Sequence, residues 1–214
     1  MEEIKRSASI KTDAHMPRRL VIGISGASGV IYGVRSLELL RHLEIETHLV
    51  MSKSAEMTLA YETDLKPSDV HAMASTHHPV GNIGASISSG SFPTMGMLIA
   101  PCSIRTMSEI ATGVTSSLLT RAADVVLKER RCLVLAVRET PLHAGHLRTM
   151  TLLAEMGAIV APIVPAFYNR PQSVDDIINQ TVGRLLDLFG LESGVVKRWH
   201  GSPARSRLAK EAEK

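Results

Sequence analysis

The chain has 214 residues, which is enough for one domain with a substantial buried core. Its 24 basic and 21 acidic residues leave a net charge of +3 without a basic stripe, and only 3% of residues are aromatic, which argues against a nucleic-acid-binding protein. Cys102 and Cys132 lack zinc-ligand spacing, and the sequence contains neither a signal peptide nor a membrane-spanning run. These features predict a reduced, cytoplasmic protein.

The two ends of the chain differ in composition from its middle. Residues 1–17 mix charged residues, Ser and Thr without apolar periodicity and are expected to form a disordered leader. A single α/β domain is expected over residues 18–199, and a polar tail over residues 200–214.

The stretch LVIGISGASGVIYG, from Leu20 to Gly33, is the strongest local signal. A short apolar run leads into three glycines, and apolar residues then recur at helical spacing, which predicts a strand, a tight turn and a helix. Ser28 is the expected N-cap of that helix. Backbone N–H groups at such a helix start favour a phosphate.

The spacing of the glycines restricts the kind of phosphate ligand. They follow G-x-x-G-x-x-G, whereas the dinucleotide fingerprint is G-x-G-x-x-G with an acidic residue about 20 positions further on. The second predicted strand, Glu46 to Met51, ends in Ser52-Lys53, so no carboxylate is placed to hold a ribose. FMN therefore fits better than NAD. The alternative is a glycine turn that only packs the strand against the helix.

The next part of the chain predicts a helix from Lys53 to Ala60, a short helix beginning at Pro67, and a long loop over residues 75–93. Long loops inside compact domains are often functional, and this one contains Ser88-Ser89-Gly90-Ser91. The adjacent His77 and His78 suggest a metal site, but without a nearby Cys or carboxylate at ligand spacing they are more simply interpreted as solvated loop residues.

A buried strand from Met95 to Pro101 precedes a second strand-to-helix junction. Ser103 is the expected N-cap of the following helix, which runs to Ala111 and carries Thr106 in its first turn. Two such junctions on one parallel sheet face the same edge, so they can hold one ligand between them.

A helix over residues 116–131 is predicted to place Arg121, Asp124 and Lys128 toward polar surroundings. The strand Cys132 to Val137 follows it and ends at Arg138-Glu139. A charged pair directly after a buried strand indicates either a functional site at the carboxyl edge of the sheet or a surface ion pair.

The last part of the sequence predicts a helix over residues 141–157, a short apolar run over 158–161, and a final helix capped by Ser173, in which Arg184 stands alone among apolar positions. Strands alternate with helices from end to end, and the strands are almost continuously apolar. This pattern predicts a three-layer Rossmann/flavodoxin-like α/β fold with a mostly parallel, doubly wound sheet.

A set of motifs, taken together, resembles the UbiX/Pad1 family of flavin prenyltransferases. The motifs are G-A-S-G-x-x-Y-G, E-T-D, S-S-G-S-F-P, P-C-S, R-A-A-D-V-x-L-K-E-R-R, L-V-L-x-x-R-E-x-P and P-A-F-Y-N-x-P-x-S-V-D-D-I. They occur in the family's order between about Arg19 and Trp199. The resemblance implies an enzyme that joins the dimethylallyl group of dimethylallyl phosphate to N5 and C6 of reduced FMN, making prenylated FMN for a UbiD-type decarboxylase.

The resemblance also implies a set of site residues and an assembly. FMN lies in that family on residues matching Gly26, Ala27, Ser28, Ser52, Ser103, Ile104, Arg105, Thr106 and Arg138. The allyl phosphate is held by residues matching Lys128, Tyr168 and Arg184, with Arg121, Ser89, Gly90 and Ser91 near the same pocket. The matching catalytic residues are Ser28, Glu62, Lys128 and Glu139. The family forms homododecamers with sites where subunits meet.

The residue types agree with this chemistry. Breaking an allylic C–O bond leaves charge on the departing phosphate, and this chain lacks the clustered aspartates that would hold a metal ion. Lys128, Tyr168 and Arg184 are therefore expected to stabilise that charge instead. Closing the second bond requires removal of a proton, for which Glu62, Glu139 and the released phosphate are all candidates.

Two other functions remain open from the sequence. One is a flavin-dependent decarboxylase acting on an aromatic acid or on peptidyl cysteine, although the His and Asn signature of peptidyl-cysteine decarboxylases is missing from the equivalent loops. The other is a non-enzymatic flavin carrier that delivers the cofactor to a decarboxylase.

Overall fold

The computed structural model describes residues 18–199 and residue 201. The expected leader, and the expected tail apart from residue 201, lie outside the described residues. In the described part of the chain, no helix has the length and apolarity needed to cross a lipid bilayer.

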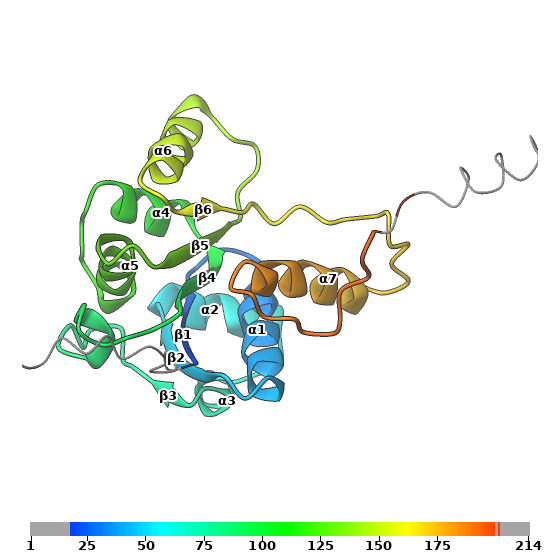
Figure 1. Ribbon diagram of the computed structural model, residues 1–214, viewed down its shortest axis with the longest axis horizontal. Helices are drawn as coiled ribbons and strands as arrows, with labels where there is room; N and C mark the ends of the chain where they lie inside the picture. Colours follow the sequence, from blue (N-terminus) through cyan, green and yellow to red (C-terminus); the bar gives the residue numbers. More distant parts are fainter. Residues whose placement is uncertain (1–17, 200, 202–214) are drawn as a thin grey trace, which may run out of the picture.

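The described chain forms six strands and seven α-helices, with one or two helices after each long strand (Figure 1). The strands are β1 (Arg19–Ile24), β2 (Glu46–Met51), β3 (Thr76–His77), β4 (Gly96–Cys102), β5 (Cys132–Val137) and β6 (Ile159–Val160). The helices are α1 (Val30–His42), α2 (Lys53–Glu62), α3 (Pro67–Met73), α4 (Ile104–Ala111), α5 (Leu118–Lys128), α6 (Ala144–Glu155) and α7 (Val174–Asp187). A 3₁₀ turn, η2, covers Ser86–Ser88.

All six strands belong to one sheet with the order β3-β2-β1-β4-β5-β6, and every neighbouring pair is parallel. The long strands are buried on both faces, as their continuous apolar sequences predict. The expected doubly wound parallel sheet is therefore confirmed.

Helices cover both faces of the sheet, and each face has its own apolar core. Leu20, Ile22 and Ile24 of β1 point toward α1, α2, α3 and α7. Val21 of the same strand belongs to the opposite core, which is built with α4, α5 and α6. Figure 1 shows α1 and α7 side by side on one face and α5 and α6 on the other. Because β1 and β4 lie at the centre of the strand order, their following helices turn to opposite faces and leave a crevice between them.

The segment expected to be a long loop is more ordered than its composition suggests. It contains β3 and η2, and His78 is only 7% exposed. The His78 Nε2 atom lies 2.9 Å from Nδ1 of the buried His48, whose Nε2 lies 2.9 Å from a carboxylate oxygen of Glu46. The prediction that His78 is a solvated loop residue is therefore wrong, because a partner 30 residues away in the sequence buries it. Within residues 18–199, no group of three or more His, Cys, Asp or Glu side chains is arranged to hold a metal ion.

Candidate functional site

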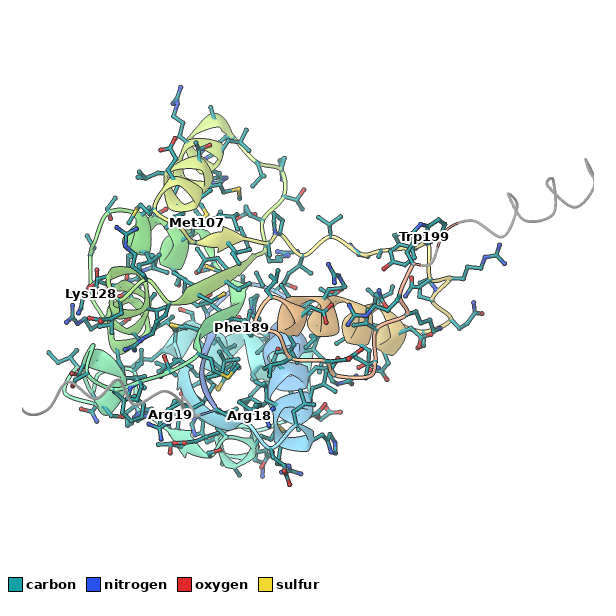
Figure 2. All side chains as sticks on the ribbon, in the orientation of Figure 1. Arg18, Arg19, Met107, Lys128, Phe189 and Trp199 are labelled. Carbon is teal, nitrogen blue, oxygen red and sulfur yellow. The ribbon has the colours of Figure 1, made fainter. Side chains whose placement is uncertain are left out.

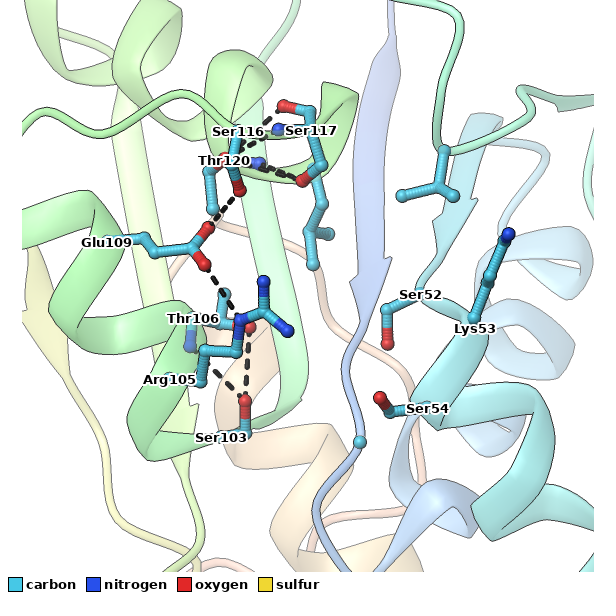
Figure 3. A pocket seen from close by; sticks show the side chains of 13 residues that line it. Ser52, Lys53, Ser54, Ser103, Arg105, Thr106, Glu109, Ser116, Ser117 and Thr120 are labelled. Atoms are coloured by element: carbon cyan, nitrogen blue, oxygen red, sulfur yellow. Dashed lines mark hydrogen bonds and ion pairs between the residues drawn. The ribbon is translucent and has the colours of Figure 1, made fainter.

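A cavity of about 370 Å³ lies at the carboxyl ends of β1, β2 and β4 (Figure 3). Its lining is rich in hydroxyl groups and contains two basic side chains, one acidic side chain and two apolar ones. The lining residues are Gly26, Ser52, Lys53, Ser54, Val80, Ser103, Arg105, Thr106, Glu109, Ser116, Ser117, Leu119 and Thr120. The volume is within the range of small-molecule sites, and the position is the switch point where such folds bind ligands.

The floor of the cavity is fixed by a hydrogen-bonded link between β1 and β4. The hydroxyl of Ser25 accepts a hydrogen bond from the Ser103 backbone N–H at 2.7 Å and donates one to the Pro101 carbonyl at 2.9 Å. Gly26 then passes so close to α2 that an added Cβ would collide with Ser54. The glycine at this position is therefore required by the close approach of two chain segments.

Three helices begin at the cavity wall, and each is capped by a serine hydroxyl. Ser52 caps α2 by accepting from the Ala55 N–H at 3.0 Å, and Ser103 caps α4 by accepting from the Thr106 N–H at 3.3 Å. Ser117 caps α5 in the same way. The expectation that Ser103 is the N-cap of α4, with Thr106 in the first turn, is confirmed. Helix starts carry partial positive charge, so the cavity as a whole favours an anionic ligand.

The start of α1 differs from the other three. Its N-cap is Gly29, in the left-handed region with φ of 97°, and no side chain of the cap residue takes part. The carboxylate of Glu62 instead accepts from the Gly29 N–H at 2.8 Å and from the Val30 N–H at 3.0 Å. The prediction that Ser28 caps this helix is therefore wrong, because a charged group from α2 takes its donors. Glu62 lies at the glycine turn as a consequence.

Six polar residues of the cavity wall were not predicted as site residues from the sequence. They are Lys53, Ser54, Glu109, Ser116, Ser117 and Thr120. One signal was available, because two consecutive serines precede an apolar helical pattern at the start of α5, which is typical of an N-cap. Glu109 gave no local signal, since its relation to the cavity depends on how α4 packs beside α5.

Arg138, Glu139 and Arg121 do not line the cavity. Arg138 and Glu139 follow β5 and are exposed at the same edge of the sheet. The Glu139 carboxylate accepts from the Thr140 N–H at 3.0 Å. Arg138 and Glu139, both described residues, do not pair with each other, so the surface ion pair that was one of the two expectations is not formed. Arg121 is half-buried on α5 and pairs with Asp124 at 2.7 Å.

Lys128 lies at the C-terminal end of α5, beside the loop that carries the Ser89-Gly90-Ser91 sequence. A Cβ on Gly90 would be 2.7 Å from the Lys128 Nζ atom. Arg131 holds this loop by donating to the Gly90 carbonyl at 2.6 Å, and the Ser89 and Ser91 hydroxyls are 2.9 Å apart. The structure therefore brings together the lysine and the loop that the family resemblance implies near one pocket.

Tyr168 and Arg184 form another group, around α7. The Tyr168 hydroxyl accepts from the Gln180 side chain at 2.9 Å, and its ring packs edge-on against Trp199 with centroids 5.7 Å apart. Gln180 and Arg184 are one helical turn apart. Arg184 is 56% exposed and pairs with Asp187 at 2.5 Å.

The cavity, the Lys128 group and the Tyr168 group occupy separate surfaces of one chain. Figure 2 shows Lys128 and Trp199 on opposite sides of the molecule. Lys128 lies 11 residues beyond the Ser117 cap at the cavity, a span of about 16 Å at about 1.5 Å per residue. A single chain therefore does not bring all the predicted site residues together.

Comparisons with known proteins agree on one family. The Flavoprotein family matches residues 8–186. Flavin prenyltransferase UbiX of Escherichia coli (strain K12) is 61% identical over 188 residues, which cover 86% of this chain and 100% of that protein. The crystal structure of AnUbiX (PadA1) in complex with FMN and dimethylallyl pyrophosphate matches with a TM-score of 0.86 and 50% identity, covering 86% of this chain and 98% of the other. A dodecameric FMN-dependent Ubix-like decarboxylase from Escherichia coli O157:H7 matches with a TM-score of 0.84 and 48% identity, covering 86% and 100%.

Proposed function

The chain belongs to the UbiX/Pad1 family of flavin prenyltransferases, and from this membership we propose that its cavity binds reduced FMN, to which the enzyme transfers a dimethylallyl group from dimethylallyl phosphate. The observation that carries the proposal is the hydroxyl-lined cavity at the switch point of a chain that matches a named flavin prenyltransferase over that protein's full length.

The residues of the cavity fit a flavin mononucleotide. Three capped helix starts and the cations Lys53 and Arg105 surround a space of about 370 Å³. No carboxylate stands at the end of β2, where a dinucleotide site would place one for the ribose diol. Gly26, Ser52, Ser103 and Thr106 are proposed to contact FMN directly. When bound, FMN supplies the N5 and C6 atoms that accept the dimethylallyl group.

The basic and phenolic side chains outside the cavity are proposed to hold the allyl phosphate. Lys128, Tyr168 and Arg184 stabilise the negative charge that develops as the C–O bond breaks, since hydrogen bonds to charged oxygens strengthen with that charge. Glu62 and Glu139 are the proposed carboxylates for proton removal. Of the two, Glu62 is the better supported candidate for proton removal, because its carboxylate lies at the glycine turn beside the cavity.

The separation of these groups supports a site shared between subunits. Within one chain, Lys128 lies at the far end of α5 from the cavity, and the Tyr168 group lies on the opposite side of the molecule. We therefore propose that copies of the chain assemble so that one copy's cavity is completed by the cations of its neighbours. The dodecameric relative supports such an assembly.

Prenylation is tested by incubating the purified protein anaerobically with reduced FMN and dimethylallyl phosphate, followed by mass spectrometry of the flavin. We expect a flavin heavier by one C5 unit. A parallel reaction with dimethylallyl pyrophosphate identifies the preferred donor. Unchanged flavin with both donors, when FMN binding has been verified, would contradict the proposal.

The name of the dodecameric relative favours one competing function, an FMN-dependent decarboxylase acting by itself. Release of CO₂ from an aromatic acid or from peptidyl cysteine by the purified protein alone would support that function. We expect no CO₂ without a partner enzyme. A UbiD-type decarboxylase is the proposed recipient of prenylated FMN, and the cytoplasm is the proposed location.

Variants of two proposed catalytic residues separate the enzyme from a flavin carrier. Glu62→Gln and Lys128→Ala are both expected to retain bound FMN and to slow product formation. A carrier would deliver FMN to its partner at the same rate in both variants, because neither change removes the cavity lining.

A further inference from the structure

A chain of hydrogen bonds crosses the wall of the cavity between α4 and the start of α5. The Ser116 hydroxyl donates to one carboxylate oxygen of Glu109 at 2.6 Å, and the Arg105 Nε–H donates to the other at 2.8 Å. Figure 3 shows the Arg105 guanidinium extending from this carboxylate toward the gap that separates it from Ser52 and Lys53 on the opposite wall.

The Glu109 carboxylate is held more firmly than in an ordinary ion pair on a helix. Its side chain is 17% exposed, whereas that of Arg105 is 81% exposed. An exposed pair four residues apart contributes little to stability, because both side chains can rotate away. Here the Ser116 hydroxyl fixes the second oxygen of the carboxylate. The hydrogen bond from Ser116 and, to a smaller extent, the contact with Arg105 lower the pKa of Glu109, so the carboxylate stays ionised at neutral pH.

Pairing through Nε leaves the outer edge of the guanidinium available. Among the described residues, the hydrogen bonds of Arg105 run through Nε alone. A guanidinium carries four further N–H donors on its two terminal nitrogens, which match two oxygens of a phosphate group. With Lys53 on the facing wall, the cavity has a cationic residue on each of two opposite walls.

We propose that Glu109 is a positioning residue that, together with Ser116, aims the terminal nitrogens of Arg105 into the cavity, where they bind the 5′-phosphate of FMN. The inference rests on the proposed function. It assigns the phosphate to the part of the cavity between Arg105 and Lys53. It also explains why a carboxylate is tolerated at an anion-binding site, since Glu109 is paired with Arg105 and acts through it.

FMN and riboflavin, which differ only in the phosphate, are the probes that test the inference. Their dissociation constants are measured by flavin fluorescence for the wild-type protein and for Arg105→Ala, Glu109→Ala, Glu109→Gln, Ser116→Ala and the double variant Arg105→Ala/Glu109→Ala. We expect Arg105→Ala to weaken FMN binding about tenfold or more, as loss of a charge-assisted hydrogen bond does, and to leave riboflavin binding unchanged.

The variants of Glu109 test the positioning role separately. Glu109→Ala is expected to weaken FMN binding about threefold to tenfold. The double variant should bind FMN as tightly as Arg105→Ala alone, because the two substitutions remove the same interaction. Glu109→Gln keeps an oxygen for Arg105 and should bind FMN within about twofold of wild type. The dissociation constant of Ser116→Ala for FMN should lie between those of the wild type and Glu109→Ala.

A matched control is available on α1, where Arg35 donates through Nε to Glu38 at 2.7 Å, away from the cavity. Glu38→Ala should leave both dissociation constants unchanged.

Tighter FMN binding by Glu109→Ala would show that the carboxylate acts by repulsion and would overturn the inference, as would additive losses in the double variant. A wild-type protein that prenylates FMN while Arg105→Ala binds it normally would overturn the inference and leave the proposed function intact. Absence of FMN binding by the wild type would overturn both.

Discussion

The cavity and the surface around Lys128 use polar side chains in different ways. In the cavity, Ser25, Ser52 and Ser103 are tied to backbone groups of their own or a neighbouring element, so one chain holds their positions. Lys128 is exposed and pairs only with its sequence neighbour Glu129 among the described residues. The difference indicates that the cavity is formed before any partner arrives, whereas the lysine depends on a ligand or a second copy to fix it.

The largest expected effect tests the exposed side of this comparison. Lys128→Ala should reduce prenylated FMN formation about 100-fold or more, because one cationic donor to the departing phosphate is lost. FMN affinity should be unchanged, since the cavity lies at the other end of α5. Turnover and FMN binding are measured on the same preparation.

Arg41→Ala is the matched control for the lysine, because Arg41 also lies in the last turn of a helix and is exposed. It should leave turnover unchanged. Equal losses of turnover in the two variants would show that Lys128 acts through general surface charge, and weaker FMN binding by Lys128→Ala would contradict the separation of the two regions.

A smaller effect is expected on the buried side of the comparison. Ser103→Ala removes the N-cap of α4 and one hydroxyl from the cavity, so it should lower the free energy of unfolding by about 1 kcal/mol and weaken FMN binding about tenfold. Ser173→Ala removes an equivalent cap, which accepts from the Asp176 N–H at 3.1 Å on α7, outside the cavity. It should cost similar stability and leave FMN binding unchanged. Equal FMN affinities in the two variants would show that the Ser103 hydroxyl does not contact FMN.

The smallest expected effect concerns pH and the loop that reaches Ser89–Ser91. Burial lowers the pKa of His78, and the nearby His48 and His77 lower it further. The unfolded chain therefore binds more protons than the folded chain below the ordinary histidine pKa of about 6.5, so stability falls as the pH drops through that value. His78→Gln should reduce the decrease in Tm between about pH 7.5 and about pH 5.5 by a few degrees.

Exposed His42 at the end of α1 provides the control for this measurement. His42→Gln should keep the wild-type dependence of Tm on pH. Because no histidine among residues 18–199 lines the cavity, the affinity for FMN should depend on acidic pH less than the stability of the loop does. An unchanged pH dependence in His78→Gln would show that the buried pair does not couple to folding.

Local sequence signals predicted the framework of the fold and failed where partners are distant. The alternation of apolar strands and periodic helices was sufficient for the parallel sheet, and the caps Ser103 and Ser173 follow from residue type and position. The cap of α1 could not be predicted, because its carboxylate comes from Glu62, 33 residues beyond Gly29. The burial of His78 depends in the same way on His48. Placing Lys128 beside Gly90 required the packing of α5 against the preceding loop, which periodicity does not encode.

The fixed length of α5 has a consequence for how this protein can change over time. Each residue inserted into or deleted from a helix turns its far end by about 100° and shifts it by about 1.5 Å. Such a change would swing Lys128 away from Gly90 while the Ser117 cap stayed in place. Relatives in which this lysine is functional should therefore differ in α5 by substitutions, and the number of residues in the helix should be the same in all of them.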